Sequence, residues 1–163
     1  MNQAVRIGPE AYTSPDFARA EREHLWRKVW LQAGRVEDLP EVGSFMTFDL
    51  LDDAVLIVRS AADTIRAFGN VCSHRGRRLI DTPALAYHTR GRQKKFTCGF
   101  HAWTFDAEGR CIGALHSEDW NGALSEERTR LGEVRLDTWG GWIWITLDPA
   151  AEPLRDWLEP VAS

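Results

Sequence analysis

Two short motifs, Cys72-Ser73-His74 and Cys98-Gly99-Phe100-His101, restrict what this chain of 163 residues can fold around more than any other feature. Each motif supplies one thiolate and one imidazole, with the spacing CxH in the first and CxxH in the second. Zinc fingers usually group their ligands differently, with two cysteines in one knuckle and two histidines on a helix. Here the two ligand types alternate along the chain, so that two loops can each give one sulfur and one nitrogen to a pair of metal ions.

Sulfur and nitrogen ligands in this proportion are those of a Rieske [2Fe–2S] cluster, which has two Cys on one iron and two His on the other. With neutral imidazoles, the charges of two ferric ions, two sulfides and two thiolates sum to zero, whereas four thiolates leave two negative charges. The less negative cluster accepts an electron more readily, and Rieske centres span about −150 to +300 mV, against about −400 mV for plant-type ferredoxins. We therefore expect Cys72 and Cys98 to bind the inner iron, and His74 and His101 to bind the outer iron. A structural zinc ion is the alternative, and metal analysis distinguishes the two.

The residues around these ligands form longer motifs. The first loop reads CSHRG at 72–76, and the second reads CGFHAW at 98–103, followed by TFDAEG at 104–109. These motifs resemble the Rieske domain of the large (alpha) subunit of aromatic-ring-hydroxylating oxygenases, which typically shows CxHRG, then CxYHGW, then a short hairpin with Asp and Gly. Flanking segments resemble the same family at 12–70, 131–147, 148–149 and 154–160. The resemblance implies that Arg75 and Gly76 shape the first loop and that Trp103 lies beside the cluster, either as an apolar shield or as part of the core.

Some positions depart from the family pattern. The gap between the two ligand motifs holds 23 residues (98 − 74 − 1), and we expect residues 83–94 to be a loop extension. Phe100 replaces the common Tyr and Ala102 replaces the common Gly; if position 102 needs a positive φ, alanine carries a steric penalty there. Respiratory Rieske proteins carry an additional Cys in each loop, and these form a disulfide. Arg77 and Phe100 occupy those places here, which favours the oxygenase or ferredoxin class.

The pattern of apolar residues and turns predicts a mainly β chain. Ser14 is suited to cap a helix that has Pro15 at its first position and runs to about Trp30, with Gly34 as its stop. Short strands are expected at 45–50, 54–59, 64–70, 96–97, 103–106, 110–112, 133–138 and 142–147. Gly140-Gly141 predicts a two-residue hairpin between the last two strands. The final strand is apolar on both faces, and we expect both faces to be buried.

The resemblance implies a Rieske-type fold of small antiparallel sheets, with a cluster-binding subdomain at about 70–115 and an added N-terminal helix. We divide the chain into an N-terminal helical segment at 1–35, a Rieske [2Fe–2S] domain at 36–150 and an exit segment at 151–163. The exit segment is expected to lead toward a catalytic domain that the chain lacks. A length of 163 residues suits this single globular domain.

The composition indicates which kinds of partner and which cellular location to expect. A net charge of −4 gives no sign of nucleic-acid binding. The N-terminal residues show no apolar h-region, so we expect no signal peptide, and the longest strongly apolar stretch, Trp139–Leu147, is too short to span a bilayer. We therefore expect no membrane attachment and a cytoplasmic location, which also suits the unpaired Cys111.

Other charged and titratable residues have two interpretations each. Seven basic residues near the ligands form either a docking surface for an acidic electron donor or a solvated basic loop: Arg75, Arg77, Arg78, Arg90, Arg92, Lys94 and Lys95. Three further histidines match no ligand of the family, and we expect them to be surface or structural residues: His24, His88 and His116.

The resemblance implies an oxidoreductase component that relays single electrons. The donor is expected to be a ferredoxin or flavin reductase. The acceptor is a mononuclear non-haem iron, bound by two His and one carboxylate, that hydroxylates an aromatic or related substrate. The family places that iron in a second domain, and the electron passes to it in an adjacent subunit of what is commonly a homotrimer.

This chain has no His after Trp120, so it lacks the residues for that second iron. We expect the N-terminal portion of an alpha subunit, which transfers electrons and does not hydroxylate a substrate alone. The alternative is a stand-alone Rieske ferredoxin. Proteins of that kind are shorter and lack both the N-terminal helix and the exit segment.

Overall fold

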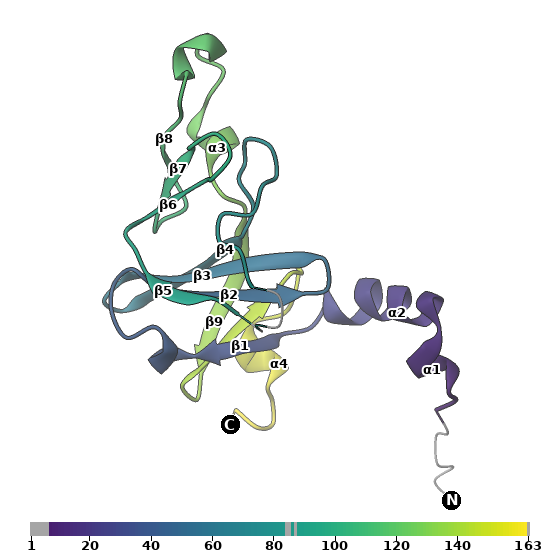
Figure 1. Ribbon diagram of the computed structural model, residues 1–163. Coiled ribbons are helices and arrows are strands. Elements are labelled where there is room, and N and C mark those ends of the chain that lie inside the picture. The colour runs from purple at the N-terminus through teal and green to yellow at the C-terminus, as the bar shows by residue number, and fades with distance from the viewer. Residues whose placement is uncertain (1–6, 84–85, 87, 163) are drawn as a thin grey trace, which may run out of the picture.

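The computed structural model describes residues 7–83, 86 and 88–162, and it places the strands in one large and one small sheet (Figure 1). The large sheet has the order β1-β10-β9-β4-β3-β2-β5, and the small sheet has the order β6-β7-β8. The large sheet contains β1 (Leu31–Arg35), β2 (Ser44–Leu50), β3 (Asp53–Ala61), β4 (Thr64–Gly69), β5 (Arg90–Arg92), β9 (Glu133–Trp139) and β10 (Trp142–Thr146). The small sheet contains β6 (Lys95–Thr97), β7 (Thr104–Asp106) and β8 (Cys111–Gly113). All neighbouring strands pair antiparallel, which confirms the predicted mainly β fold.

Strand β3 lies inside the large sheet and is buried on both faces. Successive side chains of a strand point to opposite faces, and Leu56 and Val58 accordingly join one buried cluster while Val55 and Ile57 join another. All four side chains are 1% exposed or less. The cluster on the Leu56 face also contains residues of the small sheet and the two cysteines of the ligand motifs. One continuous core therefore supports both the sheet and the candidate site.

Strand β10 confirms the predicted burial on both faces. Ile143 and Ile145 belong to the same buried cluster as Ile57, whereas Trp144 belongs to a separate cluster of tryptophans and leucines. The chain turns from β9 into β10 at Gly140-Gly141, where φ is 63° and 79°. Glycine adopts these left-handed values without a steric cost, as a two-residue hairpin requires.

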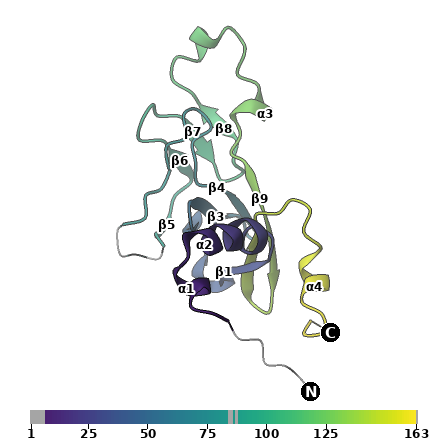
Figure 2. The same ribbon diagram turned by 90° about the vertical axis from the view of Figure 1, so that its right-hand side faces the viewer.

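The N-terminal helix is shorter than expected. Ser14 caps α2 (Pro15–Glu21), and its hydroxyl oxygen accepts an N–H of the first turn at 3.3 Å, as the capping pattern predicts. A π-helical turn, η1 (Arg22–Trp26), follows and ends there, so the expectation of a helix to Trp30 is wrong. With the short helix α1 (Glu10–Thr13), these turns form an arm that projects from the sheets (Figures 1 and 2).

Strand β1 occupies the residues that were expected to end the helix. It pairs with β10, with Leu31 opposite Ile145, so an edge supplied by the far end of the chain decides its conformation. Gly34 is part of this strand and does not stop a helix. A Cβ at Gly34 would lie 2.6 Å from the terminal methyl of Met46, so the glycine lets the Met46 side chain pack closely on this strand.

The expected loop extension at 83–94 is partly a strand. Strand β5 pairs with β2, while residues 84, 85 and 87 lie outside the described residues. The pairing depends on Gly91, because a Cβ there would lie 2.8 Å from the Phe45 ring. Four short helical segments connect the remaining strands or follow them: η2 (Val36–Asp38), η3 (Ser117–Trp120), α3 (Glu126–Thr129) and α4 (Leu154–Trp157). Among the described residues, no helix has the length and apolar character needed to cross a membrane.

Candidate iron–sulfur site

The two ligand motifs lie in loops of the same backbone construction. In the first loop, the Gly76 N–H donates to the Cys72 carbonyl at 2.9 Å, and the Cys72 N–H donates to the carbonyl of residue 77 at 2.8 Å. In the second loop, the Ala102 N–H donates to the Cys98 carbonyl at 3.0 Å, and the Cys98 N–H donates to the carbonyl of residue 103 at 2.8 Å. Each loop therefore closes on its own cysteine.

The residue that closes each loop has a left-handed backbone. The φ angle is 73° at Gly76 and 55° at Ala102. A residue with a Cβ pays about 1–2 kcal/mol in this conformation. Position 102 thus does need a positive φ, and Ala102 carries the predicted steric penalty.

Asn70 and Ser73 hold the first loop in place, and sequence reasoning did not single them out for this role. Asn70 is fully buried; its side-chain amide donates to the Ile80 carbonyl at 2.7 Å and accepts the Ile80 N–H at 3.0 Å. The Ser73 hydroxyl donates to the Thr129 carbonyl at 2.6 Å. The available signal for Asn70 was an amide side chain directly after an apolar strand, because a buried amide needs partners.

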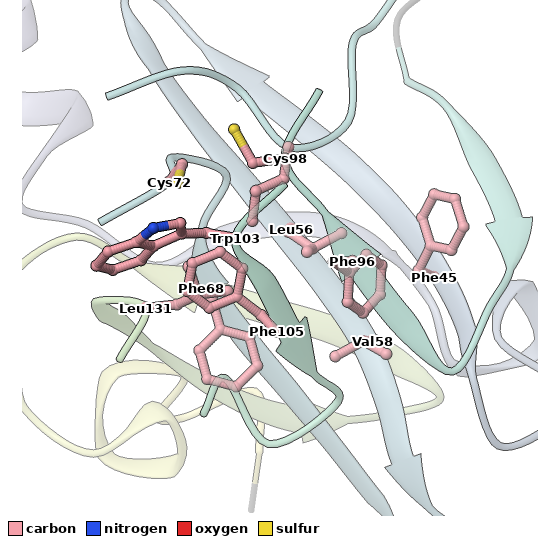
Figure 3. Close-up of a cluster of buried hydrophobic side chains, with 11 residues drawn as sticks. Phe45, Leu56, Val58, Phe68, Cys72, Phe96, Cys98, Trp103, Phe105 and Leu131 are labelled. Carbon is pink, nitrogen blue, oxygen red and sulfur yellow. The ribbon is translucent and has the colours of Figure 1, made fainter. Parts of the chain in front are cut away.

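The two cysteines lie at one end of the buried cluster beside Trp103 (Figure 3). Their relative exposures are 2% and 3% for Cys72 and Cys98, and both are free thiols. They lie within hydrogen-bonding reach of one another, and burial raises the pKa of Cys72. The backbone N–H groups of His74 and Arg75 act in the opposite direction, because they favour the thiolate. The sulfur pair is thus placed for a metal that stabilises two thiolates in an apolar setting.

The two histidines lie together as well. The ring centroids of His74 and His101 are 4.8 Å apart, and both rings are half-buried. Burial, followed by the charges of His101 and Arg75, lowers the pKa of His74. A neutral imidazole is the form that binds a metal ion.

Aromatic rings surround the histidine pair. The Trp103 ring stacks on His74 at 4.8 Å with an interplanar angle of 8°, and Trp103 also belongs to the buried core. Trp103 therefore packs in the core and also covers one face of His74, and its role as an apolar shield of the cluster stays a prediction. The exposed Arg75 and Phe100 help to line a hollow of about 340 Å³ in front of both histidines.

The model of the family described as "Rieske [2Fe-2S] domain" matches residues 29–121. The chain belongs to this family. Its cofactor is a Rieske-type [2Fe–2S] cluster, as the ligand motifs predict.

Curated relatives of this Rieske protein are oxygenase subunits. It is 30% identical over 156 residues to the methanesulfonate monooxygenase hydroxylase subunit alpha of Methylosulfonomonas methylovora, covering 93% of this chain and 38% of the relative. It is 31% identical over 153 residues to the biphenyl 2,3-dioxygenase subunit alpha of Rhodococcus jostii, covering 94% of this chain and 32% of the relative. The chain thus spans only about a third of the length of these relatives.

Solved structures show the same fold. Naphthalene 1,2-dioxygenase from Rhodococcus sp. superimposes with a TM-score of 0.85 at 25% identity, covering 96% of this chain and 34% of that one. A quaternary ammonium Rieske monooxygenase in its apo form gives a TM-score of 0.85 at 25% identity, covering 96% and 44%. The Rieske fold predicted from the ligand motifs is therefore confirmed.

The residues present fit a Rieske cluster. The Nδ1 atom of His101 is buried and finds no hydrogen-bond partner in the described part of the chain, and a buried nitrogen of this kind is costly unless something binds it. Across residues 7–83, 86 and 88–162, no three His, Cys, Asp or Glu side chains gather around a single point. The two cysteines lie as one pair and the two histidines as another, and a Rieske cluster takes one such pair at each iron.

Of the remaining candidate residues, His116 helps to line the same hollow in front of the two histidines. His24, His88 and His116 are exposed, and Cys111 is half-buried. Four of the seven basic residues are paired with carboxylates: Arg77 with Asp81, Arg78 with Asp49, Arg90 with Asp38 and Arg92 with Glu41. This pairing favours the solvated basic loop over a docking surface built from those four side chains.

Proposed function

We propose that this chain is the electron-transfer domain of a Rieske oxygenase, with Cys72 and Cys98 on the inner iron and His74 and His101 on the outer iron. One observation carries the proposal: two buried free thiols and two adjacent imidazoles are presented by a pair of loops with the same backbone closure. The orphaned Nδ1 of His101 supports the assignment of that atom as an iron ligand. We also propose that the Rieske domain spans residues 36–150, between an N-terminal segment at 1–35 and an exit segment at 151–163.

The bound cluster supplies reversible one-electron chemistry. The N–H groups of His74 and Arg75 favour negative charge on the Cys72 sulfur, and such hydrogen bonds to cluster sulfur tune the potential. Trp103 excludes water from one face of His74. Because the thiols are buried and the imidazoles are half-buried, a redox partner would reach the bound cluster from the histidine side.

The proposed partners follow from the relatives. We place a ferredoxin or flavin reductase as the donor, and the mononuclear iron of a catalytic domain, in a neighbouring alpha subunit of a trimer, as the acceptor. Inter-subunit electron transfer is described for a quaternary ammonium Rieske monooxygenase, whose structure matches this chain at 25% identity and a TM-score of 0.83. In this arrangement the isolated chain acts in the cytoplasm as one component of an oxidoreductase and does not hydroxylate a substrate alone.

The ligand assignment is tested by iron and acid-labile sulfide analysis, with EPR of the dithionite-reduced protein. We expect two irons and two sulfides per chain with a Rieske signal, and loss of both in His101→Ala. The matched control is His24→Ala, an exposed histidine outside the site, which should keep both. Zinc in place of iron, or a cluster retained in His101→Ala, would contradict the assignment.

The relay is tested separately by mixing the reduced chain with a catalytic domain that carries the mononuclear iron. We expect oxidation of the cluster within the mixture and a shared peak in gel filtration. A chain that exchanges electrons only with small redox proteins, and never with such a domain, is instead the stand-alone ferredoxin.

A further inference from the structure

We infer that Trp120 is a positioning residue for the outer-iron site: its indole covers His74 and keeps water from it, which holds the reduction potential low. The inference rests on the proposed assignment of His74 as a ligand. Trp120 was not among the residues predicted from the sequence, because it lies 46 positions after His74 (120 − 74) and outside the ligand motifs.

Ring geometry places Trp120 against the site. Its centroid is 5.8 Å from that of His74 with an interplanar angle of 75°, and 6.1 Å from that of Trp103 with an angle of 69°. Trp103 covers a face of the imidazole. The two indoles and the ring of His101 thus all pack against the ring of His74.

Trp120 borders two hollows beside His74. A hollow of about 340 Å³ and another of about 160 Å³ have three lining residues in common: His74, Trp103 and Trp120. The indole therefore forms part of the wall of both hollows. Removal of the indole would enlarge the space beside His74, which lines both hollows, and admit more water to its ring.

Trp120 lies in a short turn, η3, whose backbone conformation is fixed locally. Segment η3 is bounded by His116 and Asn121, both left-handed, with φ of 57° and 48°. Its backbone hydrogen bonds are local, from Asp119 to His116 and from Asn121 to Glu118. In Figure 1 this green turn lies beyond β8, away from the large sheet. The turn contacts the ligand loops through the indole ring of Trp120, which packs on His74 and Trp103.

The electrostatic consequence has a definite sign. With two neutral His and two thiolate ligands, the cluster is uncharged when oxidised and carries one negative charge when reduced. Water stabilises the charged state more than an apolar indole does. Opening the site at Trp120 should therefore raise the reduction potential.

The test is a redox titration of the cluster-loaded protein, followed by visible circular dichroism, for Trp120→Ala, Trp120→Phe and Trp157→Ala. Trp157 is the matched control. It is 37% exposed, against 38% for Trp120, and it lies in α4, where it packs on Trp144 of β10. We expect Trp120→Ala to shift the one-electron equilibrium toward the reduced state by roughly tenfold, which is about 59 mV. Trp120→Phe should shift it by less than half as much, and Trp157→Ala should leave it unchanged.

A second readout measures water directly. Deuterium couplings in pulsed EPR of the reduced protein in D2O should grow in Trp120→Ala and stay constant in Trp157→Ala. An unchanged potential and unchanged couplings in Trp120→Ala with full iron content would overturn the inference, as would an equal shift in the control.

If Trp120→Ala fails to retain iron, Trp120→Gln and Trp120→Phe decide the question. A raised potential in the Gln variant alone supports the apolar cover, and equal potentials in both contradict it. These outcomes are independent of the relay, since no partner protein is present. Absence of a cluster from the unmodified chain would instead contradict the proposed function.

Discussion

The equivalence of the two ligand loops leads to a prediction about stability. Gly76 and Ala102 close the loops through the same hydrogen bond, with φ of 73° and 55°, yet only one of them is glycine. We expect Gly76→Ala to destabilise the protein and Ala102→Gly to stabilise it. Gly99→Ala is the control in the second loop, because Gly99 lies outside the left-handed region.

The magnitude follows from two opposing effects. A Cβ in the left-handed region costs about 1–2 kcal/mol, while replacing glycine by alanine gains about 0.4–1 kcal/mol by restricting the unfolded chain. A Cβ at Gly76 or Gly99 would meet no atom within 4 Å, so no clash adds to these values. The unfolding free energy is expected to fall by about 1 kcal/mol in Gly76→Ala and to rise by about 1 kcal/mol in Ala102→Gly. In Gly99→Ala it should rise slightly.

Thermal unfolding of the iron-loaded variants, followed by far-UV circular dichroism at matched iron content, measures these changes. For a chain of this length, 1 kcal/mol corresponds to a shift of about 2–4 °C in Tm. The double variant Gly76→Ala with Ala102→Gly should lie near the unmodified protein if the two loops act independently. A lower Tm for Ala102→Gly, or equal losses for Gly76→Ala and Gly99→Ala, would refute the argument from backbone conformation.

Three further changes are predicted. Gly109→Ala should lower the unfolding free energy by about 2–4 kcal/mol in urea unfolding, because φ is 75° and a Cβ would lie 2.5 Å from the Phe68 ring; a neutral result would show that Phe68 moves freely. Trp30→Phe should cost about 1 kcal/mol in the same assay through loss of the 2.9 Å hydrogen bond from its indole N–H to the Glu152 carbonyl, and no loss would mean that water replaces it. The pKa of Asp148 is lowered by the Ala150 N–H and then by Lys28, so its stabilising effect is present above the ordinary carboxyl pKa and is lost as pH falls through the lowered value. Asp148→Asn should therefore show a smaller fall in Tm between pH 7 and pH 3 than the unmodified protein, and an unchanged fall would contradict this.

Local signals predicted much of the β structure. The glycine pair at 140–141 determines a tight hairpin because both positions need a left-handed backbone. The unbroken apolar run of β10 predicts burial on both faces, because neither face offers a polar surface to water. Ser14 caps α2 because its hydroxyl reaches an N–H of the first turn.

Other features depended on partners distant in sequence. Residues 31–35 continue an apparent helix, but the open edge of β10 makes them a strand. Gly34 and Gly91 read as a helix stop and a loop residue, yet both serve close packing against Met46 and Phe45. No local sequence pattern predicts these contacts, because each one joins residues on two separate strands.

The same division holds at the site. The sequence alone determined which atoms are available, since the type and spacing of Cys72, His74, Cys98 and His101 are local chemistry, and spacing of this kind matches a two-iron centre. Only the tertiary structure paired Cys72 with Cys98 and His74 with His101, aligned the two loop closures and placed Trp120 against His74. These arrangements come from packing the small sheet on the large one, and the energy of that packing is shared among many distant residues.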